Sequence, residues 1–331
     1  MKNILVLRFS SFGDIVQCLN ALRLLRQQYP EARIDFVTKE SFASLVQASG
    51  LVNNVFSYSS KKGLFALLNS CLKNSKQFRY DHILDQHSSL RSHLFCFLLS
   101  LNFFLKIHFG FKIIRRPKNR LKRFLYFYLR IPTFKFPFIG ACSYYPYPTL
   151  KSLKSVPYLV FSSNSIPDFS LPIQGEYGIL APFTAWDMKC WPLENFKQII
   201  PHLPFSQWII VGGPEDRKKA QELAEAFPEK VLNKAGEYSF LETSLLIQNA
   251  KFILTGDTGA AHVADIVGTK GLLLIGPSAF GHTVSDRLKV LENKELTCKP
   301  CSKDGRGKCR ASSYKLCLTS LTVSLVLREL D

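Results

Sequence analysis

The feature that most constrains the fold of this chain is an alternation of short apolar strands with helices, which runs through two separate parts of the sequence. Apolar, β-branched runs indicate buried strands, and apolar residues at helical spacing indicate helices. Strands are expected at 3–9, 33–37, 52–57, 82–85, 177–181, 207–211, 252–255 and 271–275. Helices are expected at 15–28, 42–48, 64–72, 90–101, 193–202, 215–226, 241–248, 258–267 and 316–330. This alternation predicts an α/β fold with two Rossmann-like parallel-sheet domains facing a cleft.

The alternation is interrupted between residues 103 and 172, where aromatic, basic and proline residues replace the regular pattern. Within this stretch, Asn-Ser-Ile-Pro-Asp at 164–168 has the composition of an interdomain linker. A chain of 331 residues is long enough for two domains of ordinary size. We therefore predict an N-terminal domain at 1–163, a linker at 164–174, a C-terminal domain at 175–315 and a terminal helix at 316–331.

The net charge of +18 is confined to the first half of the chain. Residues 1–167 hold 24 Lys and Arg against 6 Asp and Glu, whereas residues 168–331 hold 19 of each class. No acidic residue occurs between Gln86 and Pro167, a span with 13 Lys and Arg. This asymmetry predicts an anionic partner for the first half, such as phospholipid headgroups, a phosphorylated glycolipid or nucleic acid.

The apolar segments are too short to span a bilayer. The longest candidate, Leu94 to Leu105, has 12 residues, whereas a spanning helix needs about 20. The first residues lead directly into an apolar strand, without the pattern of a secretory signal. We expect a cytoplasmic protein, in which most of the nine cysteines are reduced thiols.

Three polar segments follow predicted strands, where open parallel sheets bind ligands beside helix N-termini. The first is Arg8 to Asp14, in which Asp14 either projects toward a ligand or caps a helix. The second is Thr184 to Pro192, in which Lys189 either meets a ligand or is solvated. The third is Gly256 to His262, which either offers backbone amides to a diphosphate or is an ordinary capping turn.

In this order the three segments resemble the ADP-heptose–lipopolysaccharide heptosyltransferases, glycosyltransferase family nine, which have the GT-B fold. The resemblance covers nearly the whole chain. It rests on ILVLRFSSFGDIVQCLNALRLLRQQYP, YDHILDQHSSLRS, KCWPLENF, VGGPED, DTGAAHVA and the terminal cysteine pattern. The opening segment and Asp-Thr-Gly-x-x-His are specific to the family. In this fold the C-terminal helix commonly returns to the N-terminal domain, which the resemblance implies for 316–330.

The resemblance implies a role for individual residues. Asp14 matches the general base that takes a proton from the acceptor hydroxyl, and Lys189 matches the lysine at the donor diphosphate. The other donor-binding residues are Thr184, Glu215, Asp257, Thr258, Gly259 and His262. Ser10, Ser11 and Gly13 match the loop that shapes the acceptor side. Apart from the resemblance, the basic charge of the first half leads us to expect Arg91, Arg115, Arg116 and Arg120 among the acceptor-binding residues. Inverting transfer needs such a base and a stabilised leaving diphosphate.

No metal is expected in catalysis. The chain has no Asp-x-Asp, the usual metal-diphosphate clamp of the other large glycosyltransferase fold. Lys189 and a helix N-terminus can neutralise the diphosphate instead, so we expect no cofactor and no divalent cation requirement. The cysteines Cys298, Cys301, Cys309 and Cys317 have spacing that also permits a structural zinc site, against which we weigh packing thiols and occasional disulfides.

The chain departs from the family pattern at three places. His87-Ser88 replaces a usual Gln-Gly, Asp265 replaces an alanine, and Met188 replaces a commonly polar residue. Because the first change lies in the acceptor half, the glycan that is modified becomes uncertain.

The basic aromatic segment 111–135 interleaves Lys and Arg with Phe and Tyr. This composition suits a membrane interface or nucleic acid, and the simpler interpretation is a solvated helix face. With the family resemblance, it favours a cytoplasmic enzyme at the inner face of the cytoplasmic membrane of a Gram-negative bacterium. We expect an inverting transferase that moves heptose, or a related sugar, from ADP-heptose to the lipopolysaccharide inner core. The alternatives are another sugar or acceptor in the same family, and a non-catalytic basic protein that binds membranes or nucleic acid.

Overall fold

The computed structural model comprises two compact units. It describes residues 2–59, 63–75, 80–105, 112–129, 131, 141–166, 169–278 and 283–330. Unit 1 comprises Met1–Lys118 and Gly140–Pro167, and unit 2 comprises Asn119–Ile139 and Asp168–Asp331. The main division, at Pro167–Asp168, lies within the segment 164–174 that the sequence predicts as a linker. Asn119–Ile139 groups with unit 2, whereas the sequence-based boundary assigned it to the N-terminal domain.

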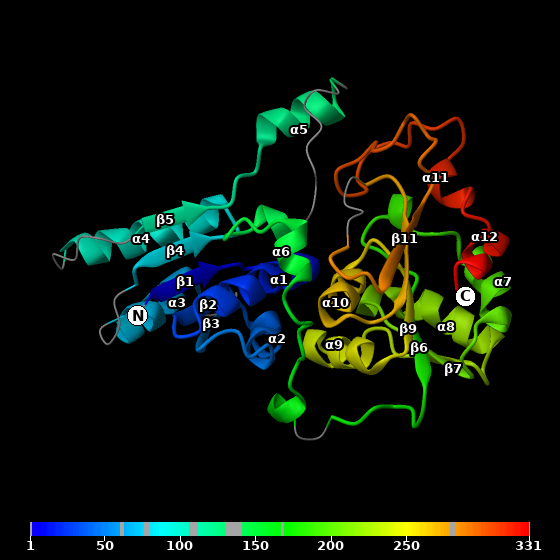
Figure 1. Cartoon of the computed structure of the whole chain (residues 1–331), viewed down its shortest axis with the longest axis horizontal. Coiled ribbons are helices and arrows are strands. Elements are labelled where there is room, and N and C mark those ends of the chain that lie inside the picture. Colours follow the sequence, from blue (N-terminus) through cyan, green and yellow to red (C-terminus); the bar gives the residue numbers. More distant parts are fainter. Residues whose placement is uncertain are drawn as a thin grey trace. The chain divides into compact units, whose positions relative to one another are not determined.

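Unit 1 is built around a five-stranded parallel sheet with the order β3-β2-β1-β4-β5 (Figure 1). The strands are β1 (Asn3–Leu7), β2 (Arg33–Lys39), β3 (Asn54–Tyr58), β4 (His82–Asp85) and β5 (Lys112–Arg115). The helices are α1 (Phe12–Gln28), α2 (Ala43–Ala48), α3 (Gly63–Ser75), α4 (Leu90–Leu105) and α6 (Leu150–Lys154), with 3-10 turns η1 (Glu40–Phe42), η3 (Ala141–Ser143) and η4 (Ser163–Ser165).

Helices α3 and α4 pack on the same face of the unit 1 sheet. Leu5 and Leu7 of β1 point to this face and form one buried cluster with residues of both helices, among them Cys71 and Phe95. Successive strand residues point to opposite faces, and all of β1 from Ile4 onward is buried. The apolar runs of the sequence therefore correspond to strands that are buried on both faces, as parallel sheets require.

Unit 2 contains a six-stranded parallel sheet with the order β11-β10-β9-β6-β7-β8 (Figure 1). The strands are β6 (Tyr177–Ala181), β7 (Gln207–Ile210), β8 (Val231–Asn233), β9 (Phe252–Gly256), β10 (Gly271–Ile275) and β11 (Leu288–Glu292). The helices are α5 (Arg120–Phe127), α7 (Leu193–Ile199), α8 (Arg217–Ala226), α9 (Phe240–Asn249), α10 (Gly259–Val267), α11 (Leu316–Thr319) and α12 (Val323–Arg328), with 3-10 turns η5 (Asp187–Lys189), η6 (Ile200–His202) and η7 (Pro214–Asp216).

The end of the chain forms two short helices, α11 and α12, where the sequence predicted one helix over 316–330. Their apolar residues Leu318 and Val326 belong to the core of unit 2, together with Trp208 of the central sheet. The Trp191 indole Nε1 donates a hydrogen bond of 2.8 Å to the backbone oxygen of Leu321, between the two helices. These contacts lie within unit 2, so a contact of this segment with the N-terminal domain stays a prediction.

The expected two α/β domains are confirmed, with three strands that the sequence analysis did not identify, β5, β8 and β11. β5 lies in the basic stretch where regular patterning is lost, and β8 has only 3 residues. Among the described residues, no helix is long and apolar enough to cross a membrane.

Candidate functional site

Each sheet has one point where the direction of strand order reverses. In unit 1 the reversal lies between β1 and β4, and in unit 2 between β6 and β9. Crevices at the carboxyl ends of strands at such points are the usual ligand sites of open α/β sheets. The segment with Asp14 follows β1, the segment with Lys189 follows β6, and the turn with Asp257 follows β9. Asp14, Lys189 and Asp257 thus lie at the two switch points.

Asp14 lies in the first turn of α1, surrounded by positive charges and hydroxyl groups. The helix begins at Phe12 with Ser11 as its N-cap, and Gly13 is helical rather than part of a loop. Asp14 is not the N-cap itself but contributes to capping, because its Oδ2 accepts from the Ser11 amide over 3.5 Å in a capping box. The Asp14 carboxylate forms an ion pair with Arg8 and lies 3.6 Å from Nη1 of Arg116. Ser11 Oγ donates to Asp14 Oδ2 over 3.0 Å.

The Tyr144 hydroxyl completes this arrangement from a distant part of the sequence. It donates to Asp14 Oδ1 over 2.9 Å and accepts a hydrogen bond of 2.9 Å from Arg116 Nη1. The Tyr144 side chain is fully buried, and the Arg116 guanidinium stacks on its ring at 4.1 Å. Sequence reasoning missed Tyr144 because it precedes Pro146 in an irregular, aromatic stretch without a motif.

The surroundings of Asp14 keep its carboxyl group ionised. Burial alone would raise its pKa, but the charges of Arg8 and Arg116 and the hydrogen bonds from Tyr144 and Ser11 outweigh burial and hold the pKa well below its usual range. A carboxylate that is deprotonated at neutral pH and one-third exposed, at 34%, can accept a proton from a bound hydroxyl group.

We call Asp14, Arg8, Ser11, Arg116 and Tyr144 the Asp14 network. The end of β4 lies beside it, and some buried polar atoms of both make no hydrogen bond to a described residue. Arg8 Nη1 donates to the backbone oxygen of Gln86 over 2.7 Å, yet Arg8 Nε, Gln86 Nε2 and His87 Nδ1 are buried and make no hydrogen bond in the described part of the chain. Burial, followed by the charge of Arg8, lowers the pKa of His87 to about 4, so this imidazole is neutral at pH 7. Ser88 has a φ of 52°, a backbone conformation that favours the glycine of the family pattern.

The other predicted acceptor residues are only partly gathered at this site. Arg115 lies at the end of β5, with Nε 3.7 Å from Asp85 Oδ2, and Arg91 in α4 lies over the ring of Tyr58 at 5.4 Å. Ser10 directly precedes the Ser11 cap. Arg120 begins α5 in unit 2, so its contribution to the acceptor site stays a prediction.

In unit 2 the Lys189 ammonium group bridges the switch point. Its Nζ lies 3.0 Å from Asp257 Oδ2, and both side chains are largely buried, with 14% and 8% exposed. Ser278, which follows β10, donates to the same Asp257 oxygen over 2.7 Å. Met188, beside the lysine, is buried, which explains an apolar residue at this position. This geometry fixes a cation where β6 and β9 end.

Gly305 is a further site residue that the sequence analysis did not identify. It has a φ of +92°, and a Cβ at this position would lie 2.6 Å from Cγ and Cδ of Lys189. The loop that carries Gly305 is anchored by a Ser278–Ser302 bridge and by Ser302 Oγ, which accepts from the Gly305 amide over 2.9 Å. This loop, part of the cysteine-containing segment 298–317, therefore passes close to the aliphatic stem of Lys189.

The turn between β9 and α10 has the geometry of a helix N-terminus at a ligand site. Thr258 is the N-cap of α10, and its Oγ1 accepts from the amide of Ala261 over 3.4 Å. Gly259 begins the helix and His262 lies in its first turn. A Cβ on Gly256 would lie 3.2 Å from Cγ2 of Thr184, so the turn and the Thr184 loop are in close contact.

Glu215, a predicted donor-binding residue, and Asp265, a departure from the family pattern, lie away from the Lys189–Asp257 pair. Glu215 is exposed in η7, after β7 and thus one strand away from the Lys189 loop. Asp265 in α10 is buried, and its Oδ1 accepts from the amides of Val284 and Ser285, each over 2.7 Å. Asp265 therefore fixes a neighbouring loop, which accounts for its departure from the family pattern.

Of the four late cysteines, Cys301, Cys309 and Cys317 are free thiols. Burial first, and then the neighbouring Cys298 and Cys309, raise the pKa of Cys301. Among the described residues, no group of three or more His, Cys, Asp or Glu side chains has the arrangement of a metal site. The structural zinc site thus stays a hypothesis without geometric support.

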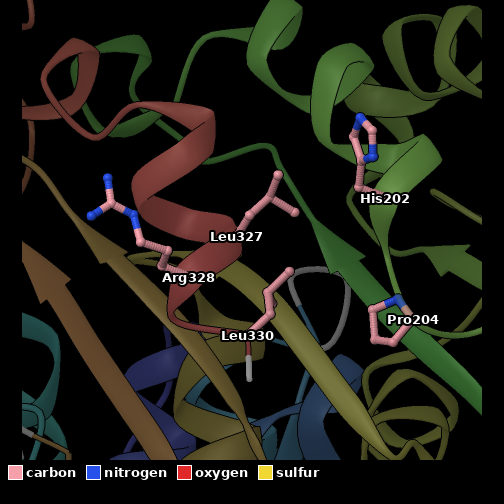
Figure 2. Close-up of a pocket in the computed structure, with 5 residues that line it drawn as sticks. All are labelled: His202, Pro204, Leu327, Arg328 and Leu330. Atoms are coloured by element: carbon pink, nitrogen blue, oxygen red, sulfur yellow. The ribbon is translucent and has the colours of Figure 1, made fainter.

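A pocket of about 300 Å³ lies between η6 and α12, lined by His202, Pro204, Leu327, Arg328 and Leu330. Figure 2 shows Leu327 of α12 and Leu330, which follows the helix, on the side that faces His202 and Pro204, whereas the Arg328 guanidinium points away. None of the sequence-predicted site residues lines this pocket, and we assign it no function.

Comparison with known proteins identifies one family. A model of glycosyltransferase family 9 (heptosyltransferase) matches residues 159–310. Lipopolysaccharide heptosyltransferase 1 of Escherichia coli K12 is 25% identical over 300 residues, which cover 84% of this chain and 89% of that protein. The structure of E. coli ADP-heptose lps heptosyltransferase II matches with a TM-score of 0.68 at 22% identity and covers 100% of this chain and 97% of that one. E. coli heptosyltransferase WaaC with ADP-2-deoxy-2-fluoro heptose matches with a TM-score of 0.60 at 20% identity, covering 99% and 98%. These findings confirm the GT-B type of fold and the resemblance that the motifs indicated.

Proposed function

We propose that the chain is a glycosyltransferase of family 9 that transfers a heptose from ADP-heptose to the lipopolysaccharide inner core with inversion of configuration. The match of the family 9 model to residues 159–310 and the similarity to lipopolysaccharide heptosyltransferase 1 support this proposal. The observation that carries the proposal is that the two switch points hold chemically different groups. An ionised carboxylate lies at one and a buried cation beside a helix N-terminus at the other. These are the two functions that inverting transfer from a sugar nucleotide requires.

The donor diphosphate binds in unit 2. Lys189 supplies a positive charge, and the first backbone amides of α10, a helix of 9 residues, supply hydrogen-bond donors. In the described structure Asp257 balances the Lys189 charge at 3.0 Å, so an incoming diphosphate competes with a carboxylate for the ammonium group. Ser278 continues to hold Asp257 when the lysine turns to the ligand.

Asp14 acts as the general base. The acceptor hydroxyl oxygen forms a bond to the anomeric carbon, the bond between that carbon and the diphosphate oxygen breaks, the proton passes to Asp14, and ADP leaves. The low pKa of Asp14 supports its ionised state before the reaction, and Arg8 and Arg116 orient it. Lys189 and the helix amides stabilise the departing diphosphate without a divalent cation.

The acceptor side is in unit 1, with Arg115 and Arg116 as binding groups for an anionic glycolipid. The enzyme acts in the cytoplasm, at the inner face of the cytoplasmic membrane, with the basic aromatic segment 111–135 at the membrane surface. The absence of acidic residues between Gln86 and Pro167 supports this orientation.

The first experiment is calorimetric titration of the protein with ADP, UDP and GDP, in the presence and absence of EDTA. We expect EDTA-insensitive binding of ADP alone, with a Kd that Lys189→Ala raises at least about tenfold, since one charged contact is lost. Lys197→Ala is the matched control, because Lys197 pairs with Glu194 on the exposed surface of α7. Binding of another nucleotide, of none, or only with metal present, would contradict the proposed donor.

A further inference from the structure

Helix α4 is apolar on two opposite faces. One face packs in the core of unit 1 through Phe95, Cys96 and Leu99. The opposite face carries Leu90, Leu94, Phe97 and Leu101, of which 90%, 50%, 61% and 43% is exposed. At about 100° per residue, these four positions fall within an arc of roughly 60°. We call Leu90, Leu94, Phe97 and Leu101 the α4 stripe.

A stripe of this kind is unusual on a helix that faces solvent. Helices at the surface of globular proteins carry polar residues on the outer side, and a helix that is apolar all round is normally covered. Single exposed apolar residues need no explanation, whereas adjacent large ones mark a binding surface. Arg91 is the one Lys, Arg, Asp or Glu in the α4 sequence, so little competes with apolar contact along the stripe.

The charge around α4 identifies what covers the stripe. In unit 1, the described residues between 86 and 166 include seven Lys and Arg and no acidic residue. One of them, Arg115, lies 3.7 Å from the same Asp85 oxygen that His93 of α4 approaches at 3.7 Å. A second copy of the chain would oppose this surface with the same positive charge. An anionic bilayer offers both an apolar layer for the leucine and phenylalanine side chains and phosphates for the surrounding cations.

We propose that the α4 stripe enters the headgroup and acyl boundary of an anionic lipid bilayer and thereby docks unit 1 on the membrane. The stripe begins at Leu90, just after the end of β4 beside the Asp14 network, and extends about 16 Å along the helix. A lipid-linked acceptor would therefore reach Asp14 from the Leu90 end of the stripe. This surface differs from segment 111–135, and it extends the proposed function without depending on transfer activity.

The test is flotation of the purified full chain with vesicles that contain phosphatidylglycerol and phosphatidylcholine, without donor or acceptor. We expect Leu94→Ser combined with Phe97→Ser to lower the vesicle partition coefficient at least about tenfold, because two large apolar side chains no longer enter the bilayer. Tyr158→Ser combined with Val160→Ser is the matched control, because these residues are also exposed and apolar in unit 1 but lie outside α4. The control is expected to bind as the wild type does.

Several outcomes would overturn the proposal. They are absence of vesicle binding by the wild type, equal loss in both double variants, or undiminished binding of the α4 variant. A wild-type dimer that the α4 variant converts to a monomer, with unchanged vesicle binding, would assign the stripe to self-association instead. Circular dichroism and ADP titration of each variant show that it is folded, and failure of ADP binding would concern the proposed function alone.

Discussion

Asp14 is held by two cations and two hydroxyl groups, and the buried hydroxyl of Tyr144 can be removed without removing a charge. Tyr144→Phe keeps the ring beneath Arg116 but removes two hydrogen bonds of 2.9 Å, one to Asp14 Oδ1 and one from Arg116 Nη1. The bond to Asp14 favours the ionised carboxylate, so its loss raises the pKa of Asp14 toward the usual range. The base must be deprotonated to act, and we therefore expect the acidic limb of kcat to move to higher pH.

We also expect kcat at neutral pH to fall about tenfold, because Tyr144→Phe removes a hydrogen bond to the charged base. The KM for the donor should stay unchanged, because Tyr144 lies in unit 1 and the proposed donor site lies in unit 2. Tyr177→Phe is the control. The Tyr177 hydroxyl is buried and donates to the backbone oxygen of Leu246 over 2.8 Å in unit 2, so its loss affects stability alone. A wild-type pH profile and kcat in Tyr144→Phe would show that Tyr144 does not position the base.

Gly305 and Gly307 form a matched pair for testing the Lys189 stem. Both have positive φ, +92° and +101°, so alanine at either position costs about 1 kcal/mol of stability. A Cβ at Gly305 would meet the Lys189 stem at 2.6 Å, whereas a Cβ at Gly307 would meet nothing within 4 Å. Calorimetry should therefore find that Gly305→Ala raises the Kd for ADP roughly fivefold to tenfold, and that Gly307→Ala leaves it unchanged. Equal affinities in the two variants would separate the cysteine-containing loop from donor binding.

Asp14 and Lys189 could be identified from the sequence because each lies in a short motif at the end of a recognisable strand. Tyr144 and Gly305 could not, because their contacts join segments that are far apart in the chain. The Tyr144 hydroxyl reaches Asp14 across 130 positions. Pairing between Lys189 and Asp257 follows from the adjacency of β6 and β9, which depends on strand order and not on either motif.

The N-cap of α10, Thr258, affects both the stability of this helix and the proposed donor site. Thr258→Ala removes the hydroxyl that accepts from the Ala261 amide, at a cost of about 1 kcal/mol. Because the same helix end would receive the diphosphate, we expect a severalfold weaker affinity for ADP in addition. Thr322→Ala removes the equivalent cap of α12, where Thr322 Oγ1 accepts from the Leu325 amide. Thermal unfolding should show similar destabilisation of both variants, and an equal effect on ADP affinity would argue against α10 as the diphosphate site.

The strands and helices that the sequence predicted share strong periodicity, and those it missed lack it. β4 and β6 have the predicted bounds because both are apolar runs that are buried in the middle of their sheets. β5 and β11 are edge strands with lysine inside or at the start, so their sequences resemble loops. The single helix expected at the end of the chain is divided at Ser320–Thr322, where Thr322 caps α12 and starts a new helix.

Tryptophan fluorescence reports on unit 2 separately from unit 1. All three tryptophans, Trp186, Trp191 and Trp208, lie in unit 2, so the fluorescence of tryptophan monitors the unfolding of that unit. If the donor binds there, ADP at one hundred times its Kd stabilises the unit by about 2.7 kcal/mol. The midpoint of thermal unfolding by tryptophan fluorescence should then rise by roughly 5–10 °C.

Lys189→Ala distinguishes this effect from general stabilisation by ADP. In this variant the shift with the same ADP concentration should shrink, because the ratio of ligand concentration to Kd falls at least about tenfold. UDP and GDP serve as further controls, since neither should raise the midpoint in the wild type. A midpoint that does not respond to ADP would exclude a donor site at the switch point between β6 and β9. That outcome would contradict ADP-heptose as the donor, and the proposed general base Asp14 would lack its co-substrate.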